Sequence, residues 1–464
     1  MSYQGVPELF ERKISEVLMA TGGCATDINA NKNIGIFVIN DKEAEKNCCY
    51  VSVNGKNHKG NEFALNAISR GASLVISEEE IGDKIPLIKV KDSIKALCDT
   101  AEYFRKKELE YVIAITGSVG KTTTKELCAN VLSQAVRVHK TDGNKNSIIG
   151  LPLSVLGNRE CRAAVLEAGI SEKWEMSVLS RVARPDVAVI TDIGPAHTET
   201  LGTVEDIVKE KLKISEYMPK DGKMLLPEKL KKAKCFCKNI ITYGIGADNA
   251  DYCGTVTGFD RNGSYFTLEK KGKKVIKDLF VPIIGNHACH DALAAAAAGD
   301  LSGCSEKDIR EGLKLYKSDG VRQNITQING ITVIEDYYNM SPLSAVSALG
   351  ALEKISRIYG KNKKIVMFGD MLELGNMSEE EHKKIGKEVV KIGAAALITV
   401  GKNSRLISEQ AIRSGMPEDV VVHFSSDRRD DAGKMLKKIS DSGSVVLIKG
   451  SRGMRMEEFP AYLE

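Results

Sequence analysis

The sequence lacks any run of about eighteen apolar residues, so no transmembrane helix is predicted. Its first residues, MSYQGVPELFERKISEVL, carry acidic side chains early and do not form a basic segment followed by an apolar one, which argues against a secretion signal. The net charge is only +4, from 66 basic and 62 acidic residues, so bulk charge gives no support for binding nucleic acid or a membrane surface. We expect a cytoplasmic monomer whose partners are small-molecule substrates.

The sequence shows neither a cysteine spacing typical of disulfide or metal sites nor an internal repeat. The eleven cysteines are odd in number, and no two are separated by the two residues found in zinc knuckles. This pattern predicts reduced thiols without a metal role. With no internal repeat or low-complexity tract, 464 residues that are 42% hydrophobic and 28% charged predict about three globular domains.

Strand and helix patterns divide the chain into three α/β units. Residues 1–108 form a small unit with short strands, and residues 318–464 begin a new α/β cycle that we expect to be Rossmann-like. Between them, 109–317 alternates apolar strands with amphipathic helices, which predicts a mostly parallel sheet that places ligands at its strand ends. Within that middle unit, 252–280 alternates apolar and polar residues around an Arg-Asn-Gly turn and predicts antiparallel strands.

A glycine-rich loop in the middle unit is the most informative motif. An apolar strand leads into TGSVGKT at 116–122, and a helix follows. Gly117 and Gly120 permit the tight turn that brings backbone N–H groups to phosphate oxygens. Lys121 is expected to neutralise phosphate charge, and Thr122 to offer its hydroxyl to Mg²⁺. The loop lacks the earlier glycine of the general G-x-x-x-x-G-K-[ST] pattern, and the alternative is a plain strand–turn–helix junction with a solvent-facing lysine.

Two further strand ends in this unit carry polar side chains. Glu167 ends the strand predicted at 163–167, where a carboxylate commonly holds Mg²⁺ in P-loop sheets. A Gly-Pro turn then places His197 and Glu199 after the strand predicted at 187–192, and His197 is a candidate ligand for a metal or phosphate. The alternatives are a solvated glutamate and a structural histidine.

Two loops in the last unit stand out. The run DYYNMSP at 336–342 contains a good helix entry at Ser341-Pro342, which does not account for Asp336 or Asn339. The run KGSRGMR at 449–455 combines glycines with cations, as an anion site does. An exposed basic turn is the alternative.

Taken together, these residues resemble the Mur ligase family of ATP-dependent amino-acid ligases. The resemblance extends from about residue 110 to the end, and it includes the GPAH turn at 194–197, the GNH run at 285–287 before an alanine-rich helix, and the two C-terminal runs FGDMLELG at 368–375 and KGSRGMRME at 449–457. It implies the cofactors ATP and Mg²⁺ and an acyl-phosphate mechanism. The two C-terminal runs imply an activity that adds D-alanyl-D-alanine to UDP-N-acetylmuramoyl-tripeptide.

The resemblance also implies residue roles. The expected ATP-binding residues are Gly117, Ser118, Val119, Gly120, Lys121, Thr122, Thr123, His287, Arg322, Asp336 and Asn339. The expected metal ligands are Thr122, Glu167, His197 and a carbamylated Lys211. The expected catalytic residues are Lys121, Lys211 and His197. The expected substrate contacts are Asn144, Asn146, Asp370, Lys449, Ser451 and Arg452.

The sequence departs from the family pattern in two places. Ala288 and Asp291 stand where the family has paired asparagines that contact adenine. The N-terminal signature that binds UDP in the family is altered at 40–42, 47–53 and 59–61. These departures leave open a related enzyme that joins another carboxylate to an amino acid or dipeptide. A P-loop regulatory ATPase is the alternative from another class.

Overall fold

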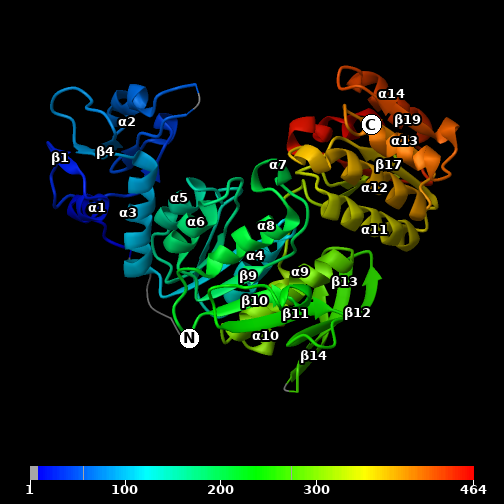
Figure 1. The fold of residues 1–464 in the computed structure, drawn as a ribbon, viewed down its shortest axis with the longest axis horizontal. Helices are drawn as coiled ribbons and strands as arrows, with labels where there is room; N and C mark the ends of the chain where they lie inside the picture. Colours follow the sequence, from blue (N-terminus) through cyan, green and yellow to red (C-terminus); the bar gives the residue numbers. More distant parts are fainter. Residues whose placement is uncertain (1–8, 56, 273) are drawn as a thin grey trace.

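The computed structural model describes residues 9–55, 57–272 and 274–464. It contains three α/β units, each built on its own sheet, and both terminal units lie on the same side of the central one (Figure 1). The predicted fold class of three α/β domains with mostly parallel sheets is confirmed. The domain boundaries at 108/109 and 317/318 stay predictions.

The N-terminal unit has a five-stranded sheet with the order β1-β5-β4-β3-β2, in which β1 alone is antiparallel to its neighbour. Its elements are α1 Ile14–Thr21, β1 Cys24–Thr26, β2 Phe37–Val38, β3 Cys49–Val51, α2 Ala64–Ser69, β4 Leu74–Ser77, β5 Leu87–Lys89 and α3 Ser93–Glu108. β2 is only two residues long and pairs with β3, and Asn47, two residues before β3, has a φ of 66°.

The central unit has a nine-stranded sheet with the order β14-β13-β12-β11-β10-β9-β6-β8-β7. Its strands are β6 Tyr111–Thr116, β7 Val138–Lys140, β8 Ala163–Glu167, β9 Val187–Ile190, β10 Lys223–Pro227, β11 Asn239–Ile245, β12 Tyr252–Asp260, β13 Gly263–Lys270 and β14 Lys274–Val281. The sheet is parallel from β7 to β12, and the predicted antiparallel segment extends it at one edge. β6 therefore lies between β8 and β9, so that the loops after these three strands meet at one sheet edge.

Helices cover both faces of the central sheet. They are α4 Lys121–Leu132, α5 Gly150–Gly157, α6 Glu175–Ala183, α7 Thr198–Leu201, α8 Val204–Leu212, α9 Asn286–Leu301 and α10 Glu306–Lys314. The alanine run of α9 is fully buried against α4 and the sheet. Small side chains on every face allow this helix to approach its neighbours closely, which holds α4 and the loop before it in place.

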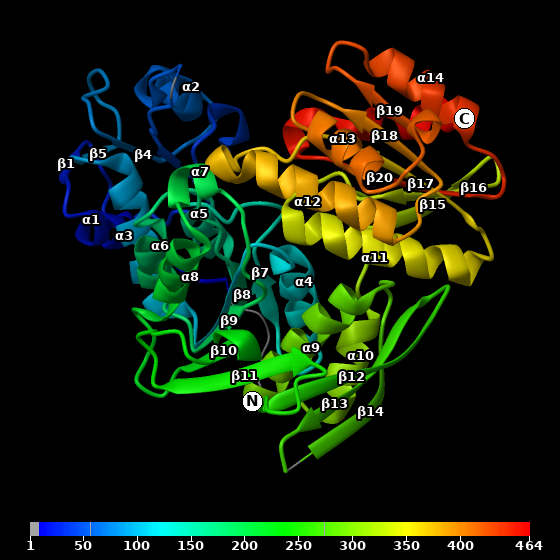
Figure 2. The same ribbon diagram turned by 45° about the vertical axis from the view of Figure 1, so that its right-hand side comes forward.

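The C-terminal unit has a six-stranded sheet with the order β15-β16-β20-β17-β18-β19, parallel except for the edge strand β15. Its elements are β15 Asn324–Ile328, β16 Ile331–Glu335, α11 Pro342–Tyr359, β17 Lys363–Phe368, α12 Ser378–Lys391, β18 Ala396–Val400, α13 Arg405–Arg413, β19 Val421–Phe424, α14 Arg429–Ile439 and β20 Ser444–Lys449. In Figure 2, α11 and α12 lie on the side of this unit that faces the central one. The loops after β16 and β20 thus lie close to the phosphate loop.

The N-terminal unit is joined to the central one through buried arginines. Arg105, on α3, donates hydrogen bonds of 2.7 Å to the carbonyls of Ala183 and Arg184 in the central unit. Arg12 donates two hydrogen bonds, of 2.7 and 2.6 Å, to the Glu108 carboxylate, and also bonds backbone carbonyls at the end of α5. Because α3 runs almost directly into β6, these contacts attach the N-terminal unit firmly.

Two global predictions can be compared with this fold. Every helix among the described residues is too short or too polar to cross a membrane. All eleven cysteines lie in the described part of the chain, and each has a free thiol, as their spacing predicted.

Candidate active site

The phosphate loop lies between β6 and α4 and is held by the loop that follows β9. Ser118 donates its backbone N–H to the carbonyl of Asp192 at 2.6 Å and its hydroxyl to the carbonyl of Gly194 at 2.9 Å. Val119 forms a backbone bridge to Asp192. Gly117 has no room for a side chain, because an added Cβ would overlap the Thr191 hydroxyl. The loop is therefore preorganised before any ligand arrives.

Gly120 ends the loop in a left-handed conformation, with φ of 79°, and precedes the first turn of α4. Lys121 donates its ammonium to the carbonyls of Gly117 at 2.9 Å and Ser118 at 3.3 Å. Burial lowers the pKa of Lys121, and so does the positive charge of Arg322, while Glu167 opposes the shift. An anion bound at the N-terminus of α4 would be stabilised by the charge of Lys121 and by the helix dipole. Thr123, in the same first turn, is half-buried.

Glu167 lies at the carboxyl end of β8 and is 2% exposed. Its carboxylate accepts a hydrogen bond of 2.9 Å from the Thr122 hydroxyl and one of 2.6 Å from the Asn146 amide. Gly169 permits this arrangement, because an added Cβ would lie 2.9 Å from the Asn146 side chain. Three predicted residues from separate segments thus meet beside the phosphate loop.

Lys211 is 2% exposed and lies at the end of α8. Among the described residues, its ammonium has no hydrogen-bond or ion-pair partner. Burial lowers the pKa of Lys211 well below its usual value, and the charge of Lys121 adds to the effect. Compared with a solvated lysine, burial and the nearby cation thus shift the balance toward the neutral amine, which is the nucleophilic form.

His197 contacts the C-terminal unit. Its Nδ1 lies 2.6 Å from Oε2 of Glu373, in the loop after β17. Burial lowers the pKa of His197; the charges of Lys121 and Lys211 act in the same direction, and Glu373 opposes them. Glu199, which was expected to share this cleft, has an exposed side chain.

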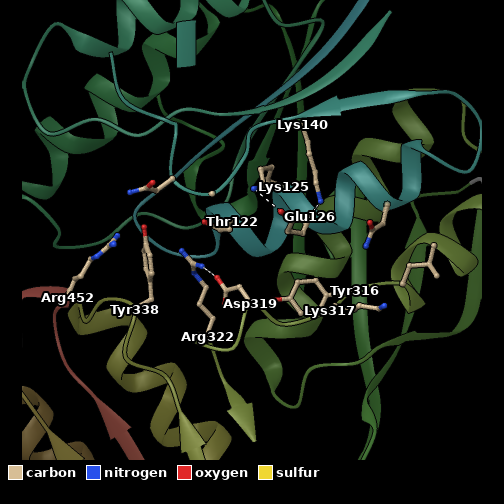
Figure 3. Close-up of a pocket in the computed structure, with 14 residues that line it drawn as sticks. Thr122, Lys125, Glu126, Lys140, Tyr316, Lys317, Asp319, Arg322, Tyr338 and Arg452 are labelled. Carbon is tan, nitrogen blue, oxygen red and sulfur yellow. Dashed lines mark hydrogen bonds and ion pairs between the residues drawn. The ribbon is translucent and has the colours of Figure 1, made fainter. Parts of the chain in front are cut away.

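A cavity of about 600 Å³ opens between the phosphate loop and the C-terminal unit (Figure 3). It is lined by Thr122, Lys125, Glu126, Asn130, Lys140, Gly143, Asn144, Leu315, Tyr316, Lys317, Asp319, Arg322, Tyr338 and Arg452. The guanidinium of Arg322 lies 3.7 Å from the centre of the Tyr338 ring, and that of Arg452 lies 5.5 Å from it. Cations outnumber carboxylates on these walls, so the cavity suits a polyanion.

Other predicted residues are enclosed within the C-terminal unit. Lys449 donates its ammonium to the Asp336 carboxylate at 2.8 Å and to the carbonyl of Asn339 at 2.9 Å. Ser451 accepts a hydrogen bond from the backbone of Leu372 and donates one to the carbonyl of Met340. These bonds hold the loops after β16 and β20 against each other. Lys449 and Ser451 thus stabilise the two loops that carry Tyr338 and Arg452.

Asp370 and His287 are also engaged by other groups. The Asp370 carboxylate accepts three backbone hydrogen bonds, of 2.7 to 3.0 Å, from residues 402–404. His287, at the start of α9, lies 2.9 Å from the Gln323 amide oxygen, and burial lowers its pKa. The roles assigned to these side chains stay predictions.

Binding of ATP with Mg²⁺ requires oxygen ligands for the metal beside the phosphate loop. Among the described residues, no group of three or more His, Cys, Asp or Glu side chains could hold a metal by itself. Mg²⁺ that accompanies ATP ordinarily takes one or two protein oxygens and completes its shell with phosphate and water. The Thr122 hydroxyl and the Glu167 carboxylate supply such oxygens beside the phosphate loop, so the residues fit the pair.

Fold and site together define a three-unit P-loop enzyme whose phosphate loop faces a cationic cavity beside the C-terminal unit. Comparisons with known proteins agree with this class. The family description "Mur ligase middle domain" matches residues 115–299, and "Mur ligase, glutamate ligase domain" matches 322–452. The UDP-N-acetylmuramoyl-tripeptide–D-alanyl-D-alanine ligase of Bacillus subtilis (strain 168) is 35% identical over 424 residues, which is 90% of this chain and 90% of that protein. The chain belongs to the Mur ligase family.

Solved structures extend the match to the whole chain. A crystal structure of MurF from Acinetobacter baumannii superposes with a TM-score of 0.88 at 26% identity and covers 99% of both chains. A structure of MurF ligase from Thermotoga maritima in complex with ADP has a TM-score of 0.79 at 25% identity, and covers 92% of this chain and 97% of that one. The N-terminal unit, which carries the altered signature, is thus included in the similarity.

Several site residues were not predicted individually. Glu373 and Tyr338 lie inside sequence runs that were noted, but nothing in the runs singled them out. Lys125 and Glu126 follow the phosphate loop on α4 and were given no role, although Lys125 is buried and donates to the carbonyl of Thr141 at 2.7 Å. Their spacing of four and five residues from Lys121 was the available signal.

Proposed function

We propose that this protein uses ATP to join D-alanyl-D-alanine to UDP-N-acetylmuramoyl-tripeptide in the synthesis of peptidoglycan precursors. The observation that carries the proposal is the preorganised phosphate loop beside Glu167 and the cationic cavity, in a chain that matches the Bacillus subtilis ligase along 90% of both lengths. The free thiols favour a reducing cytoplasm as the place of the reaction.

The proposed chemistry has two steps. A carboxylate oxygen of the tripeptide attacks the γ-phosphorus of ATP, the bond to the bridging oxygen breaks, and ADP leaves an acyl phosphate behind. The amine of the dipeptide then attacks the acyl carbon, loses a proton and displaces phosphate. Lys121 and the backbone N–H groups of the loop hold the phosphoryl oxygens, so catalysis consists mainly of positioning and charge neutralisation. Mg²⁺, when bound by Thr122 and Glu167, supplies further neutralisation.

Lys211 is proposed to act as a carbamate. The ammonium first loses a proton, and the neutral amine then attacks CO₂, forms an N–C bond and releases a second proton, which leaves a carbamate anion at this buried position. The resulting anion would lie near Lys121, whose positive charge now disfavours the ammonium form of Lys211. Carbamylation therefore turns an unfavourable pair of buried cations into a favourable ion pair.

The N-terminal unit is proposed to hold the uridine end of the substrate despite its altered signature. A cavity of about 310 Å³ in this unit is lined by Ile39, Tyr50, Val53, Gly55, Asn57, His58, Gly60 and Phe63. Its aromatic side chains and backbone polar groups suit a flat ring that forms hydrogen bonds at its edge. The Tyr50 hydroxyl stabilises this cavity by donating a hydrogen bond of 2.8 Å to the carbonyl of Gly60, which also lines it.

Release of phosphate from ATP tests the proposal directly. The rate is measured with UDP-N-acetylmuramoyl-tripeptide alone, with D-alanyl-D-alanine alone, and with both. The proposal expects sustained release only with both substrates, together with one amide product per phosphate. Release with the tripeptide and another amino acid would instead identify the related enzyme with a different acceptor, and release without either substrate would identify a regulatory ATPase.

A further inference from the structure

His197 and Glu373 connect two different units of the molecule. His197 precedes α7 in the central unit, and Glu373 follows β17 in the C-terminal unit, yet Nδ1 and Oε2 lie 2.6 Å apart. Figure 2 shows α7 beside the start of α12, which directly follows the Glu373 loop. The contact therefore exists only when the two units are docked.

Both residues have unusual backbone conformations. His197 has φ of 54° and Glu373 has φ of 64°, a region that side chains other than glycine rarely adopt. Neighbouring bonds hold them there: the Thr198 hydroxyl donates to the carbonyl of Leu374 at 2.8 Å, and the Leu201 amide donates to the carbonyl of His197 at 2.9 Å. Two strained residues that meet across a domain boundary point to a functional contact, because strain of this kind persists where the surroundings impose it.

The hydrogen bond to Glu373 determines which ring nitrogen of the neutral His197 imidazole is available. When Nδ1–H donates to Glu373, the lone pair of His197 is on Nε2. Among the described residues, Nε2 has no hydrogen-bond partner. A histidine that binds a metal or phosphate is ordinarily fixed through its other nitrogen by a carboxylate, which sets the tautomer and the orientation of the ring.

The Glu373 side chain is 60% exposed, whereas that of His197 is 30% exposed. A polar contact with one partner so well solvated adds little to stability, so it can break and re-form during each catalytic cycle. In the described part of the chain, Glu373 has no other charged partner. Within residues 9–55, 57–272 and 274–464, the one polar side-chain contact of Glu373 is thus with a predicted active-site residue of another unit.

We propose that Glu373 is a positioning residue of the reaction: by holding Nδ1 of His197 it orients this histidine toward the phosphate loop, and it does so only when the C-terminal unit has docked. The inference rests on the proposed function for its catalytic meaning. The unit expected to deliver the amine would thus also complete the site that activates the carboxylate. This arrangement withholds activation until the acceptor domain is in place, which limits the loss of acyl phosphate to water.

The test compares Glu373→Ala with Glu373→Gln in the full-length protein. Glu379→Ala serves as the matched control, because Glu379 is an exposed carboxylate a few residues away at the start of α12. We expect Glu373→Ala to lower kcat by about 10- to 100-fold, with a KM for ATP that changes by less than about threefold. Glu373→Gln, whose amide oxygen can still accept from Nδ1–H, is expected to recover most of the activity, and the control is expected to match the wild type.

A second readout does not depend on the substrates. Nitrogen-15 NMR of labelled histidine reports which ring nitrogen carries the proton, and His197 is assigned through a His197→Gln variant. We expect the Nδ1–H form in the wild type and the Nε2–H form in Glu373→Ala. An unchanged tautomer in Glu373→Ala, or an unchanged kcat in an active wild-type background, would overturn the inference. If the wild type shows no turnover with the proposed substrates, the proposed function fails while the NMR comparison still decides the role of Glu373.

Discussion

The carboxyl group of Asp291, on α9, packs directly against Gly120, the last glycine of the phosphate loop. An added Cβ at Gly120 would overlap that carboxyl, so the two residues leave no space between them. Burial raises the pKa of Asp291 well above its usual value, and the nearby charge of Asp192 adds to the effect. A carboxyl group that resists ionisation thus stands beside the phosphate loop.

Asp291→Asn is expected to stabilise the protein at alkaline pH. Because the folded-state pKa is raised, the folded protein binds this proton more tightly than the unfolded chain does, so stability is lost as pH rises above the unfolded value of about 4. Replacing the acid removes this loss, and we expect a gain of roughly 1 to 3 kcal/mol at pH 8 that shrinks toward pH 5. Urea unfolding at several pH values measures it, and an equal gain at all pH values would contradict the assignment.

Lys121→Ala is expected to abolish most activity while leaving the fold intact. In the part of the chain that the structure describes, the ammonium bonds only carbonyls of its own loop, so its loss removes charge from the phosphate site and little packing. We expect a fall in kcat of about 10²- to 10³-fold, measured by phosphate release. Lys277→Ala, on the exposed face of the distant strand β14, provides the matched control and should behave as the wild type.

Lys211→Ala is expected to inactivate the enzyme and to be partly rescued by small carboxylates. If the side chain functions as a carbamate, acetate or formate can occupy the space and restore negative charge, whereas Lys211→Arg retains a cation and should not be rescued. Lys209→Ala, an exposed lysine on the same helix, tests for nonspecific effects. Activity assays with 0 to about 200 mM acetate give the answer, the upper concentration being kept low enough to limit screening. Full activity of Lys211→Ala without acetate would remove the proposed role.

Arg12→Ala is expected to lower the free energy of unfolding by about 3 to 5 kcal/mol, because it leaves the buried Glu108 carboxylate without its partner. Glu108→Ala should cost a similar amount. Replacing both residues together should cost less than the sum of the two single changes. Chemical denaturation measures these effects, and Arg70→Ala, which changes an exposed arginine of the same unit, should lie within about 0.5 kcal/mol of the wild type.

Asp370→Ala is expected to destabilise the C-terminal unit, because three backbone N–H groups of the 402–404 turn lose their acceptor. We expect a loss of about 3 kcal/mol in the stability of this unit. Asp419→Ala, at an exposed site, is the control. A variant with unchanged thermal unfolding and a raised KM for the acceptor amine would instead support the substrate role that the family resemblance implied.

Local patterns predicted the fold well where they were strong. The strand at 163–167 was found with its observed bounds, and the phosphate loop was identified from its glycines and lysine. Short strands such as β2 were less predictable, because their length depends on pairing with a partner strand, here β3. The intrinsic propensity of the residues indicates whether a segment forms a helix or a strand, whereas pairing with a neighbouring strand determines where the strand ends.

The candidate site was predictable as a set of residues but not as a set of contacts. Glu167 could be proposed from its place at a strand end and Asn146 from the family resemblance, and the structure brings them within hydrogen-bonding distance. The pairing of His197 with Glu373 could not be anticipated, since it depends on how two separately folded units dock. Asp370 could be named as a candidate, but its contacts could not be predicted. The sequence around a carboxylate after a strand is the same whether the side chain faces a ligand or a backbone turn.

The attachment of the N-terminal unit has a consequence for substrate choice. α3 spans sixteen residues, or about 24 Å, and continues almost directly into the strand that carries the phosphate loop. Arg105 and Arg12 are hydrogen-bonded to carbonyls of the central unit. α3 therefore forms a rigid connection that fixes the distance between the N-terminal cavity and the phosphate loop. A molecule that contacts both the N-terminal cavity and the phosphate loop, as the proposed substrate does, has to match the distance between them, and this distance does not depend on which side chains line the cavity.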